Sequence, residues 1–299
     1  MSEVILRQAQ AIRALFQAAL ADARLEPKLW RHAAAYREYF RQFGPPERFV
    51  ATFDDDLRLH VSLSDHIESM IYFHEMQEGD RGLVRFLKMA VGPGTAFIDV
   101  GANIGFHTLI AAKRAAPGGC VHAFEPVRET YGRLEENLSL NALSGVTTYR
   151  VGLSDSPATA TIHVPCGPNK GMATLHRDAK TPTDPEVIVL DTLDRLVASG
   201  TIGRVDVMKV DVEGHELAVL EGAENTLKTF RPLVACEFSK EHLGRAGHHP
   251  EQVTEKMATL GYQPFALDER GQVFAHVVFE EHENLVFIHR DEVASGTRD

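Results

Sequence analysis

The sequence predicts an α/β protein whose main domain is a largely parallel sheet with helices on both faces. From residue 95 onward, apolar runs of strand length alternate with segments in which apolar residues recur every three or four positions. That alternation favours parallel strands, because each helix carries the chain back to the same edge of the sheet. A second observation is the glycine turn Gly101 to Gly105, which directly follows the first apolar run. Such a turn is typical of a ligand-binding α/β domain.

Residues 1–80 are expected to form a separate helical and hairpin accessory segment. Apolar residues have helical spacing between residues 5 and 20, and a second helix is expected from Pro27 towards Phe43, before Gly44-Pro45-Pro46. Residues 48–63 alternate between apolar and polar, as in a β-hairpin. The accessory segment either caps a substrate or pairs two subunits through its helices.

The main domain is expected to span residues 81–299. Its candidate strands are Ala96–Val100, Cys120–Phe124, Thr147–Val151, Val205–Val210, Leu233–Phe238, Tyr262–Leu267 and Asn284–His289. Its candidate helices are Gly105–Ala116, Val127–Asn141, His215–Thr229 and Pro250–Leu260. Between residues 158 and 190, dense prolines and glycines indicate a short antiparallel excursion, which either borders a substrate or is a surface loop.

Composition narrows the class of protein. With 299 residues, of which 44% are hydrophobic, the chain can bury one large core plus an accessory segment. Its three cysteines, Cys120, Cys166 and Cys236, lie far apart, as in a reduced cytoplasmic protein. No apolar run near the amino terminus approaches the roughly 18 residues that cross a bilayer, so no membrane partner is expected. A net charge of -11 disfavours nucleic acid as a partner.

The glycine turn predicts an adenosine-containing ligand. The apolar run before it ends at Asp99, and the helix that begins at Gly105 offers free amide donors. The next apolar run ends at Glu125, about 20 residues further on, where an acid can accept both hydroxyls of a ribose. The alternative is a tight strand-to-helix turn with no ligand.

The glycine pattern also distinguishes between adenosine cofactors. A dinucleotide site usually reads G-x-G-x-x-G, whose middle glycine makes room for a pyrophosphate. This chain has Ala102 and Asn103 there instead. The amide of Asn103 could reach a zwitterionic amino-acid end, which S-adenosylmethionine has. The turn therefore favours S-adenosylmethionine over NAD.

Six sequence blocks between about Glu75 and Glu237 carry a family resemblance. In chain order they are IDVGANIG, AFEP, LSD, LDTLD, VDVMKVDVEGHELAVLEGA and RPLVACE. Together they resemble the FkbM-type S-adenosylmethionine-dependent methyltransferases. The resemblance implies a Rossmann-like seven-stranded sheet of order 3-2-1-4-5-7-6 with its last strand antiparallel. It also implies O-methylation of hydroxyls on sugars or natural products.

The resemblance further implies which residues contact the cofactor. They are Asp99, Gly101, Asn103 and Gly105 around the methionine part, Glu125 at the ribose, Ser154 and Asp155 near the adenine, and Glu75 at the cofactor mouth. Ser154-Asp155 is also an ordinary turn pair.

A hydroxyl acceptor must lose its proton to a base. The strand that ends near Val210 should lie beside the strand that ends at Val100, and ligands of such sheets bind in the crevice between the carboxyl ends of these two strands. A base is therefore expected just after Val210. Glu213 and His215 are the first candidates, followed by Asp211 and Glu237. Structural alternatives remain open for three of them. Glu213 could cap the following helix, His215 could lie on the exposed side of that helix, and Asp211 could hold a loop amide.

The sequence predicts no resident metal. Its fifteen histidines show no H-x-x-x-H spacing and its cysteines no C-x-x-C spacing, although Asp211 and Glu213 could hold Mg²⁺ together with substrate oxygens. The expected function is S-adenosylmethionine-dependent O-methylation of a small hydroxylated acceptor. The alternatives are a catalytically silent binding module that keeps the cofactor fold and, less favoured, an NAD-dependent oxidoreductase.

Overall fold

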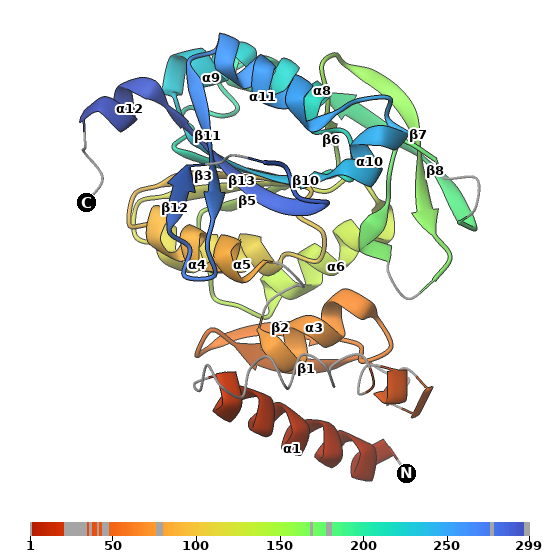
Figure 1. The fold of residues 1–299 in the computed structure, drawn as a ribbon. Coiled ribbons are helices and arrows are strands. Elements are labelled where there is room, and N and C mark those ends of the chain that lie inside the picture. The colour runs from red at the N-terminus through yellow and green to blue at the C-terminus, as the bar shows by residue number, and fades with distance from the viewer. Residues whose placement is uncertain are drawn as a thin grey trace. The chain divides into compact units, whose positions relative to one another are not determined.

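The computed structural model describes residues 2–20, 35, 38–40, 42–43, 48–75, 80–167, 170–177, 181–275 and 278–295. They fall into two compact units (Figure 1). Unit 1 comprises residues 1–78 and 167–170, and unit 2 comprises residues 79–166 and 171–299. Among the described helices, none combines the length and the apolar character that crossing a membrane requires.

Unit 1 contains helices and a hairpin. Its elements are α1 (Ser2–Leu20), β1 (Phe49–Phe53), β2 (Leu57–Val61) and α3 (His66–His74). β1 and β2 pair antiparallel around a turn in which Asp54 and Asp55 have φ of 44° and 72°, a left-handed conformation that Asp tolerates. The helix predicted over residues 5–20 and the hairpin predicted over residues 48–63 are confirmed. The helix predicted from Pro27 to Phe43 lies mostly outside the described residues.

The core of unit 2 is an eight-stranded sheet of order β12-β11-β13-β10-β9-β3-β4-β5. The bounds are β3 Ala96–Val100, β4 Cys120–Phe124, β5 Val146–Tyr149, β9 Val207–Val210, β10 Leu233–Ser239, β11 Tyr262–Leu267, β12 Val273–Ala275 and β13 His282–His289. Counted along the chain without β12, the strands run 3-2-1-4-5-7-6, and β13 is antiparallel to both neighbours. The predicted α/β fold class is confirmed, although the sheet has eight strands rather than seven.

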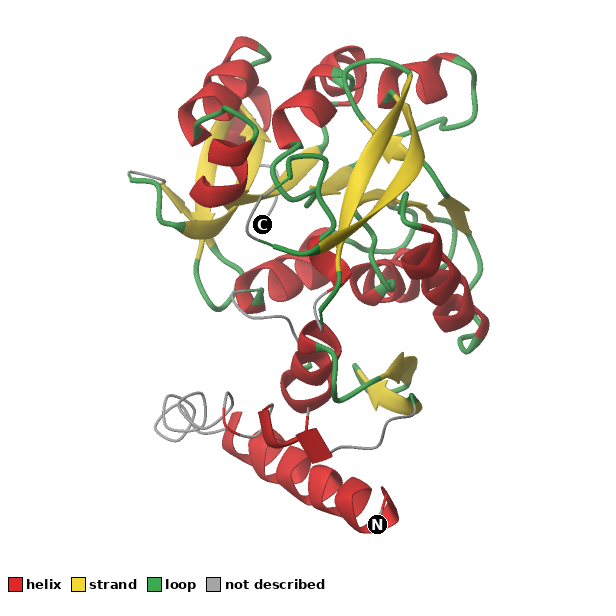
Figure 2. Cartoon of the chain, turned by 90° about the vertical axis from the view of Figure 1, so that its right-hand side faces the viewer, coloured by secondary structure: helices red, strands yellow, loops and turns green. Residues whose placement is uncertain are grey.

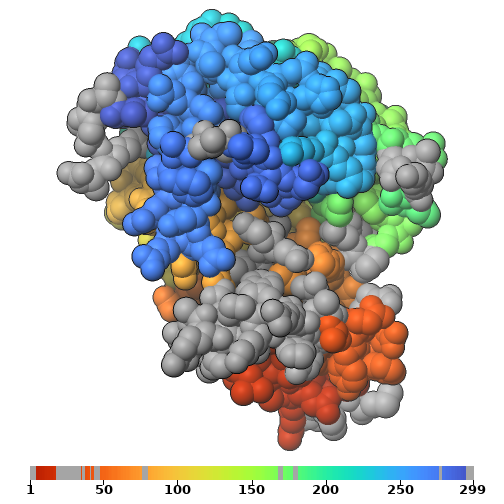
Figure 3. All heavy atoms as spheres, viewed as in Figure 1, coloured from red at the N-terminus to blue at the C-terminus, as the bar shows by residue number. Residues whose placement is uncertain are grey.

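The additional strand, β12, lies at one edge of the sheet and pairs only with β11 within the described chain. All three of its residues are exposed, so they show no alternation between buried and exposed positions that sequence inspection could detect. In Figure 3, blue segments from the C-terminal part of the chain form much of the visible surface of unit 2.

Helices cover both faces of this sheet (Figure 1). Those on one face include α8 (Glu216–Glu221), α9 (Glu224–Phe230) and α11 (Pro250–Thr259), and those on the other include α4 (Arg81–Ala90), α5 (Phe106–Ala115) and α6 (Arg128–Ser139). Ile98 and Met208 lie in the core cluster with α8, α9 and α11. Phe97 and Val207 lie in the cluster with α4 and α5. Side chains therefore alternate between the two faces along each strand.

The single helix predicted over His215–Thr229 is wrong, because the chain forms α8 and α9 with a break between them. At the break, Gly222 passes so close to another segment that a Cβ would lie 1.9 Å from the carbonyl oxygen of Ser154. Asp194 then accepts the backbone N–H groups of Asn225 and Thr226 and so starts a new helix. Among the described α-helices, sequence analysis also missed five: α3 in unit 1, and α4, α7 (Leu193–Ala198), α10 (Lys240–Arg245) and α12 (Arg290–Ser295) in unit 2.

The antiparallel excursion predicted between residues 158 and 190 is confirmed. β7 (Ala158–Pro165) and β8 (Thr183–Asp191) form a long two-stranded ribbon, which is clear in Figure 2. The short β6 (Gly152–Leu153) pairs with β8, and a 3₁₀ turn lies over Lys170–Met172. Ile188 and Leu190 are buried on one face of the ribbon, whereas Val187 and Val189 are exposed on the other.

Candidate functional site

The glycine turn follows β3 and contacts residues at the ends of β9 and β4, the two strands on either side of β3. Gly101 has φ of 76°, and a Cβ there would lie 1.9 Å from the carbonyl oxygen of Asp211, just past β9. The backbone N–H groups of Gly101 and Ala102 both donate to the carbonyl oxygen of Phe124, at 3.0 and 2.9 Å. Gly105, with φ of 94°, precedes α5. Only glycine fits position 101, because any side chain would strike the backbone of the neighbouring loop.

Glu125 lies directly against this turn. Its Oε2 accepts the backbone N–H of Asn103 at 3.0 Å, and its Oε1 accepts that of Val127 at 2.9 Å. Burial raises the pKa of Glu125 to about 7, although both amide hydrogen bonds act to lower it. The structure thus brings together the turn and the acid that the sequence assigns to the two ends of an adenosine cofactor.

Asp99 lies beneath the turn rather than on an open surface. Its side chain is fully buried. Its Oδ2 accepts the hydroxyl of Thr108 on α5 at 2.6 Å, and its Oδ1 lies 3.5 Å from Nζ of Lys209. Asp99 is two residues from Phe97 along β3 and therefore faces α4 and α5 as Phe97 does. This placement indicates that Asp99 supports the turn from below.

Lys209 is a buried cation at the centre of the site, and sequence analysis did not single it out. Its side chain is only 3% exposed, and its Nζ lies 3.0 Å from Oδ2 of Asp211. The same Nζ donates to the carbonyl oxygen of Gly101 at 3.0 Å. A lysine within the otherwise apolar VMKV of β9 is the signal that could have identified it, because charged residues are rarely buried without a partner.

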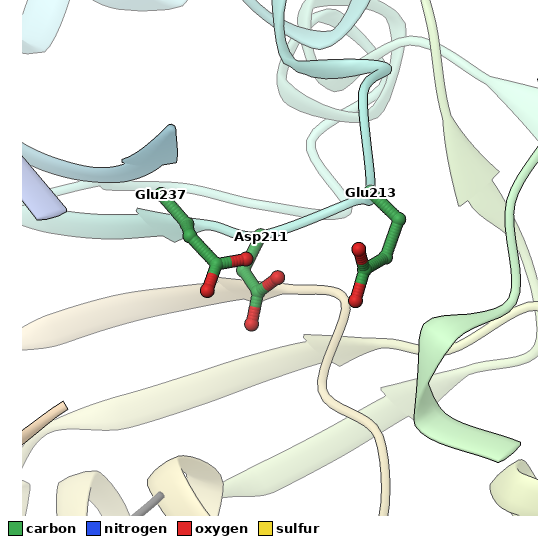
Figure 4. A group of neighbouring side chains, drawn as sticks. All are labelled: Asp211, Glu213 and Glu237. Carbon is green, nitrogen blue, oxygen red and sulfur yellow. The ribbon is translucent and has the colours of Figure 1, made fainter. Parts of the chain in front are cut away.

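Three acids that the sequence proposed as bases form one cluster. Carboxylate oxygens of Asp211, Glu213 and Glu237 lie within 4.8 Å of one another. Figure 4 shows Asp211 beside Glu237, with Glu213 reaching towards them from the loop after β9. The three side chains are half-buried at the carboxyl ends of β9 and β10. The sheet thus places the predicted acids where adjacent parallel strands end.

Asp211 and Glu237 have opposite pKa shifts. Burial acts to raise the pKa of Asp211, but the charge of Lys209, hydrogen bonds with Glu237 and Lys209 and the charge of His107 together outweigh burial and hold that pKa below its usual range. Burial, followed by the charge of Asp211, raises the pKa of Glu237 well above its usual range. Of these two acids, the site therefore favours the ionised form of Asp211 and the protonated form of Glu237.

Each acid of the cluster also has a cationic or imidazole partner. Asp211 pairs with Lys209, Oε2 of Glu213 lies 2.5 Å from Nδ1 of His242, and Oε1 of Glu237 lies 3.1 Å from Nε2 of His282. Burial lowers the pKa of His242, but its hydrogen bond with Glu213 and the charge of that acid raise the pKa overall. Oxygen donors of this kind suit Mg²⁺, so these three acids could hold a divalent cation in competition with their partners.

His215 does not join the acid cluster. Its Nε2 lies 2.9 Å from the hydroxyl of Ser154, and its Nδ1 lies 3.3 Å from Nε2 of His176. Ser154 in turn donates to Asp155 at 3.0 Å. Burial, with the charge of His176, lowers the pKa of His215 to about 4. The expectation of an exposed His215 is therefore wrong, and the ring contacts the residues assigned to the adenine.

The alternative that Glu213 caps α8 is also wrong. The acid that orders this region is Glu216, whose Oε1 accepts the backbone N–H groups of Val212 and Gly214 in the loop before α8, at 3.2 and 3.0 Å. Glu213 has φ of 55°, and its carbonyl oxygen accepts the hydroxyl of Thr174. This geometry leaves the Glu213 side chain directed at His242 and the acid cluster.

Glu75, assigned to the cofactor mouth, belongs to unit 1, whereas the other predicted site residues belong to unit 2. It ends α3 with φ of 55°. Its Oε1 accepts a hydrogen bond from Nε2 of Gln17 at 2.8 Å. The same oxygen lies 3.3 Å from a guanidinium nitrogen of Arg13. The described contacts of Glu75 therefore tie α1 to α3.

Comparison with known proteins identifies the family. Residues 99–264 match the Methyltransferase FkbM domain family. Hexuronic acid methyltransferase AglP of Haloferax volcanii is 33% identical over 180 residues, which are 60% of this chain and 68% of that protein. Methyltransferase sdnD of Sordaria araneosa is 34% identical over 163 residues, 44% of this chain and 62% of that protein.

A solved structure of a methyltransferase FkbM from Methylobacillus flagellatus is 17% identical, with a TM-score of 0.40 over 66% of this chain and 44% of that one. The family match covers more than half of the chain. The chain belongs to the FkbM family of methyltransferases, whose cofactor is S-adenosylmethionine.

Proposed function

We propose that this protein is an S-adenosylmethionine-dependent O-methyltransferase that acts on a hydroxyl of a sugar or a natural-product-like small molecule. The observation that carries the proposal is the meeting of the glycine turn with Asp211 at neighbouring strand ends. A cofactor cradle and a group of acids thus share one edge of the sheet. The name of AglP, a hexuronic acid methyltransferase, supports a sugar acid as the acceptor.

The residues of the turn fit S-adenosylmethionine. The backbone at Gly101 has no room for a Cβ, and Glu125 is held at the turn by two amides, as a ribose-binding acid needs to be. We propose that Gly101, Asn103 and Gly105 hold the methionine part and Glu125 the ribose. Ser154 and Asp155, with His215 behind them, would hold the adenine. When bound, the cofactor supplies a methyl group on a positively charged sulfur.

The acid cluster would take the proton from the acceptor hydroxyl. Glu237 is a weaker candidate because burial and the charge of Asp211 raise its pKa and favour its protonated form. His215 is a poor base because both ring nitrogens have partners. Asp211 and Glu213 are the remaining candidates. A base within hydrogen-bond reach typically contributes about 10² to 10⁴ in rate.

Two measurements test the proposed function in sequence. Calorimetric titration with S-adenosylhomocysteine, S-adenosylmethionine and NAD is expected to show binding of both sulfur compounds and none of NAD. Methyl transfer from methyl-labelled S-adenosylmethionine is then assayed against hexuronic acids, neutral hexoses and hydroxylated natural products. Preference for NAD would contradict the proposal, and cofactor binding without turnover on every acceptor would favour a silent binding module.

A further inference from the structure

Lys209 joins the two halves of the candidate site. Its Nζ carries three protons and has three oxygen neighbours: the carbonyl of Gly101, Oδ2 of Asp211 and Oδ1 of Asp99. An ammonium group that is only 3% exposed is costly to bury, and two carboxylates and a carbonyl offset that cost. Lys209 therefore contacts the glycine turn at Gly101 and two acids, Asp211 and Asp99.

The same two chain segments are also in direct backbone contact. Gly101 packs against the carbonyl of Asp211 so closely that no Cβ fits between them. On its other side, the turn is fixed by the two hydrogen bonds to Phe124. On the β9 side, the Lys209 side chain links the turn to Asp211, because its Nζ contacts both Gly101 and Asp211. A shift of Asp211 would therefore move the turn as well.

We propose that Lys209 is a positioning residue, which fastens the glycine turn to Asp211. This inference rests on the proposed function, because it holds a candidate base next to the cofactor turn, where an acceptor hydroxyl must lose its proton. Lys209 itself acts through Gly101 and Asp211.

The first test measures S-adenosylhomocysteine affinity by calorimetry. Lys209→Met keeps the apolar stem and removes the cation, and it is expected to weaken binding about tenfold or more, because a charge-assisted hydrogen bond to the turn is lost. Asp211→Asn leaves the bond from Lys209 to Gly101 and should retain most of the affinity. Lys228→Met, the same change on an exposed lysine, is the matched control and should bind as the wild type does.

The second test separates the cation from the packing of its stem. Lys209→Arg keeps a positive charge with N–H donors, and it should bind S-adenosylhomocysteine several-fold more tightly than Lys209→Met does. A role of the apolar stem alone would weaken binding equally in both variants. If Lys209→Met does not fold, Lys209→Met/Asp211→Asn removes one charge of each sign, and its S-adenosylhomocysteine affinity then reports the link to the turn.

Unweakened S-adenosylhomocysteine binding in folded Lys209→Met or in the folded double variant, or equal weakening in Lys209→Arg and Lys209→Met, would overturn the inference. Failure of the proposed function looks different. In that case the wild type itself would not bind S-adenosylhomocysteine.

Discussion

At the scale of single residues, the site pairs groups that are far apart in the sequence. Glu213 and His242 lie on different elements, yet Oε2 of the acid is 2.5 Å from Nδ1 of the imidazole. Glu125 reaches back 22 positions to the amide of Asn103. Each of these pairs predicts a distinct effect when one partner is replaced.

Replacing Glu125 by alanine should weaken S-adenosylhomocysteine binding by about 1–3 kcal/mol, because a charged hydrogen-bond acceptor for the ribose is lost. The fold should be retained, as judged by circular dichroism. Glu255→Ala, on the exposed face of α11, serves as the control with the same change. Unchanged affinity in Glu125→Ala would mean that the ribose is held by other residues.

Replacing Glu213 by glutamine should lower the pKa of His242, because the charge that raises this pKa is removed. Histidine Cε1–H signals followed by NMR across pH would show the change. If Glu213 is the base, turnover should fall more than cofactor affinity. Equal turnover of wild type and variant across pH would exclude that role.

At the scale of elements, side-chain carboxylates fix the starts of the two helices after β9. Glu216 closes the loop before α8 through the amides of Val212 and Gly214, and Asp194 begins α9. These hydrogen bonds explain why a helix predicted as one segment folds as two.

Replacing Asp194 by alanine should destabilise the protein by about 1–2 kcal/mol, because the first-turn amides of α9 lose their acceptor. Urea unfolding followed by circular dichroism measures this loss. Asp184→Ala, at an exposed position of β8, is the matched control and should change stability by less than about 0.5 kcal/mol. Similar losses in both variants would argue against the capping role.

At the scale of the whole molecule, buried acids make stability depend on pH. Burial raises the pKa of Glu216 to about 7 from an ordinary 4.5, so the folded state favours its protonated form. Its contribution to stability is fully present below about pH 4.5 and is lost as the pH rises through about 7.

Glu216→Gln keeps an oxygen that can accept both loop amides but removes this titration. Between pH 5 and pH 8, the free energy of unfolding should therefore fall less steeply in the variant than in the wild type, as measured by urea unfolding at each pH. Glu255→Gln, an exposed control, should follow the wild-type curve. If the free energy of unfolding falls as steeply with pH in the variant as in the wild type, the pKa of Glu216 is not raised.

Sequence reasoning was successful where burial leaves a local pattern. The strands around Ile98, Val121 and Val234 are apolar because both faces are covered, and the turn at Gly101 has a local spacing that identifies it. It could not place Lys209 or His242, because their roles depend on contacts between strands and helices that only the folded sheet brings together. Pairing of two subunits through residues 1–80 stays a prediction.

The shortness of β12 disfavours strand pairing between molecules in concentrated solution. A sheet edge exposes unpaired N–H and C=O groups, and a long flat edge lets another chain add on and start a fibril. Here the outermost strand is only three residues long. Its neighbour β11 also contains Pro264, which lacks an N–H group. This border of the molecule is therefore a poor template for intermolecular β-aggregation.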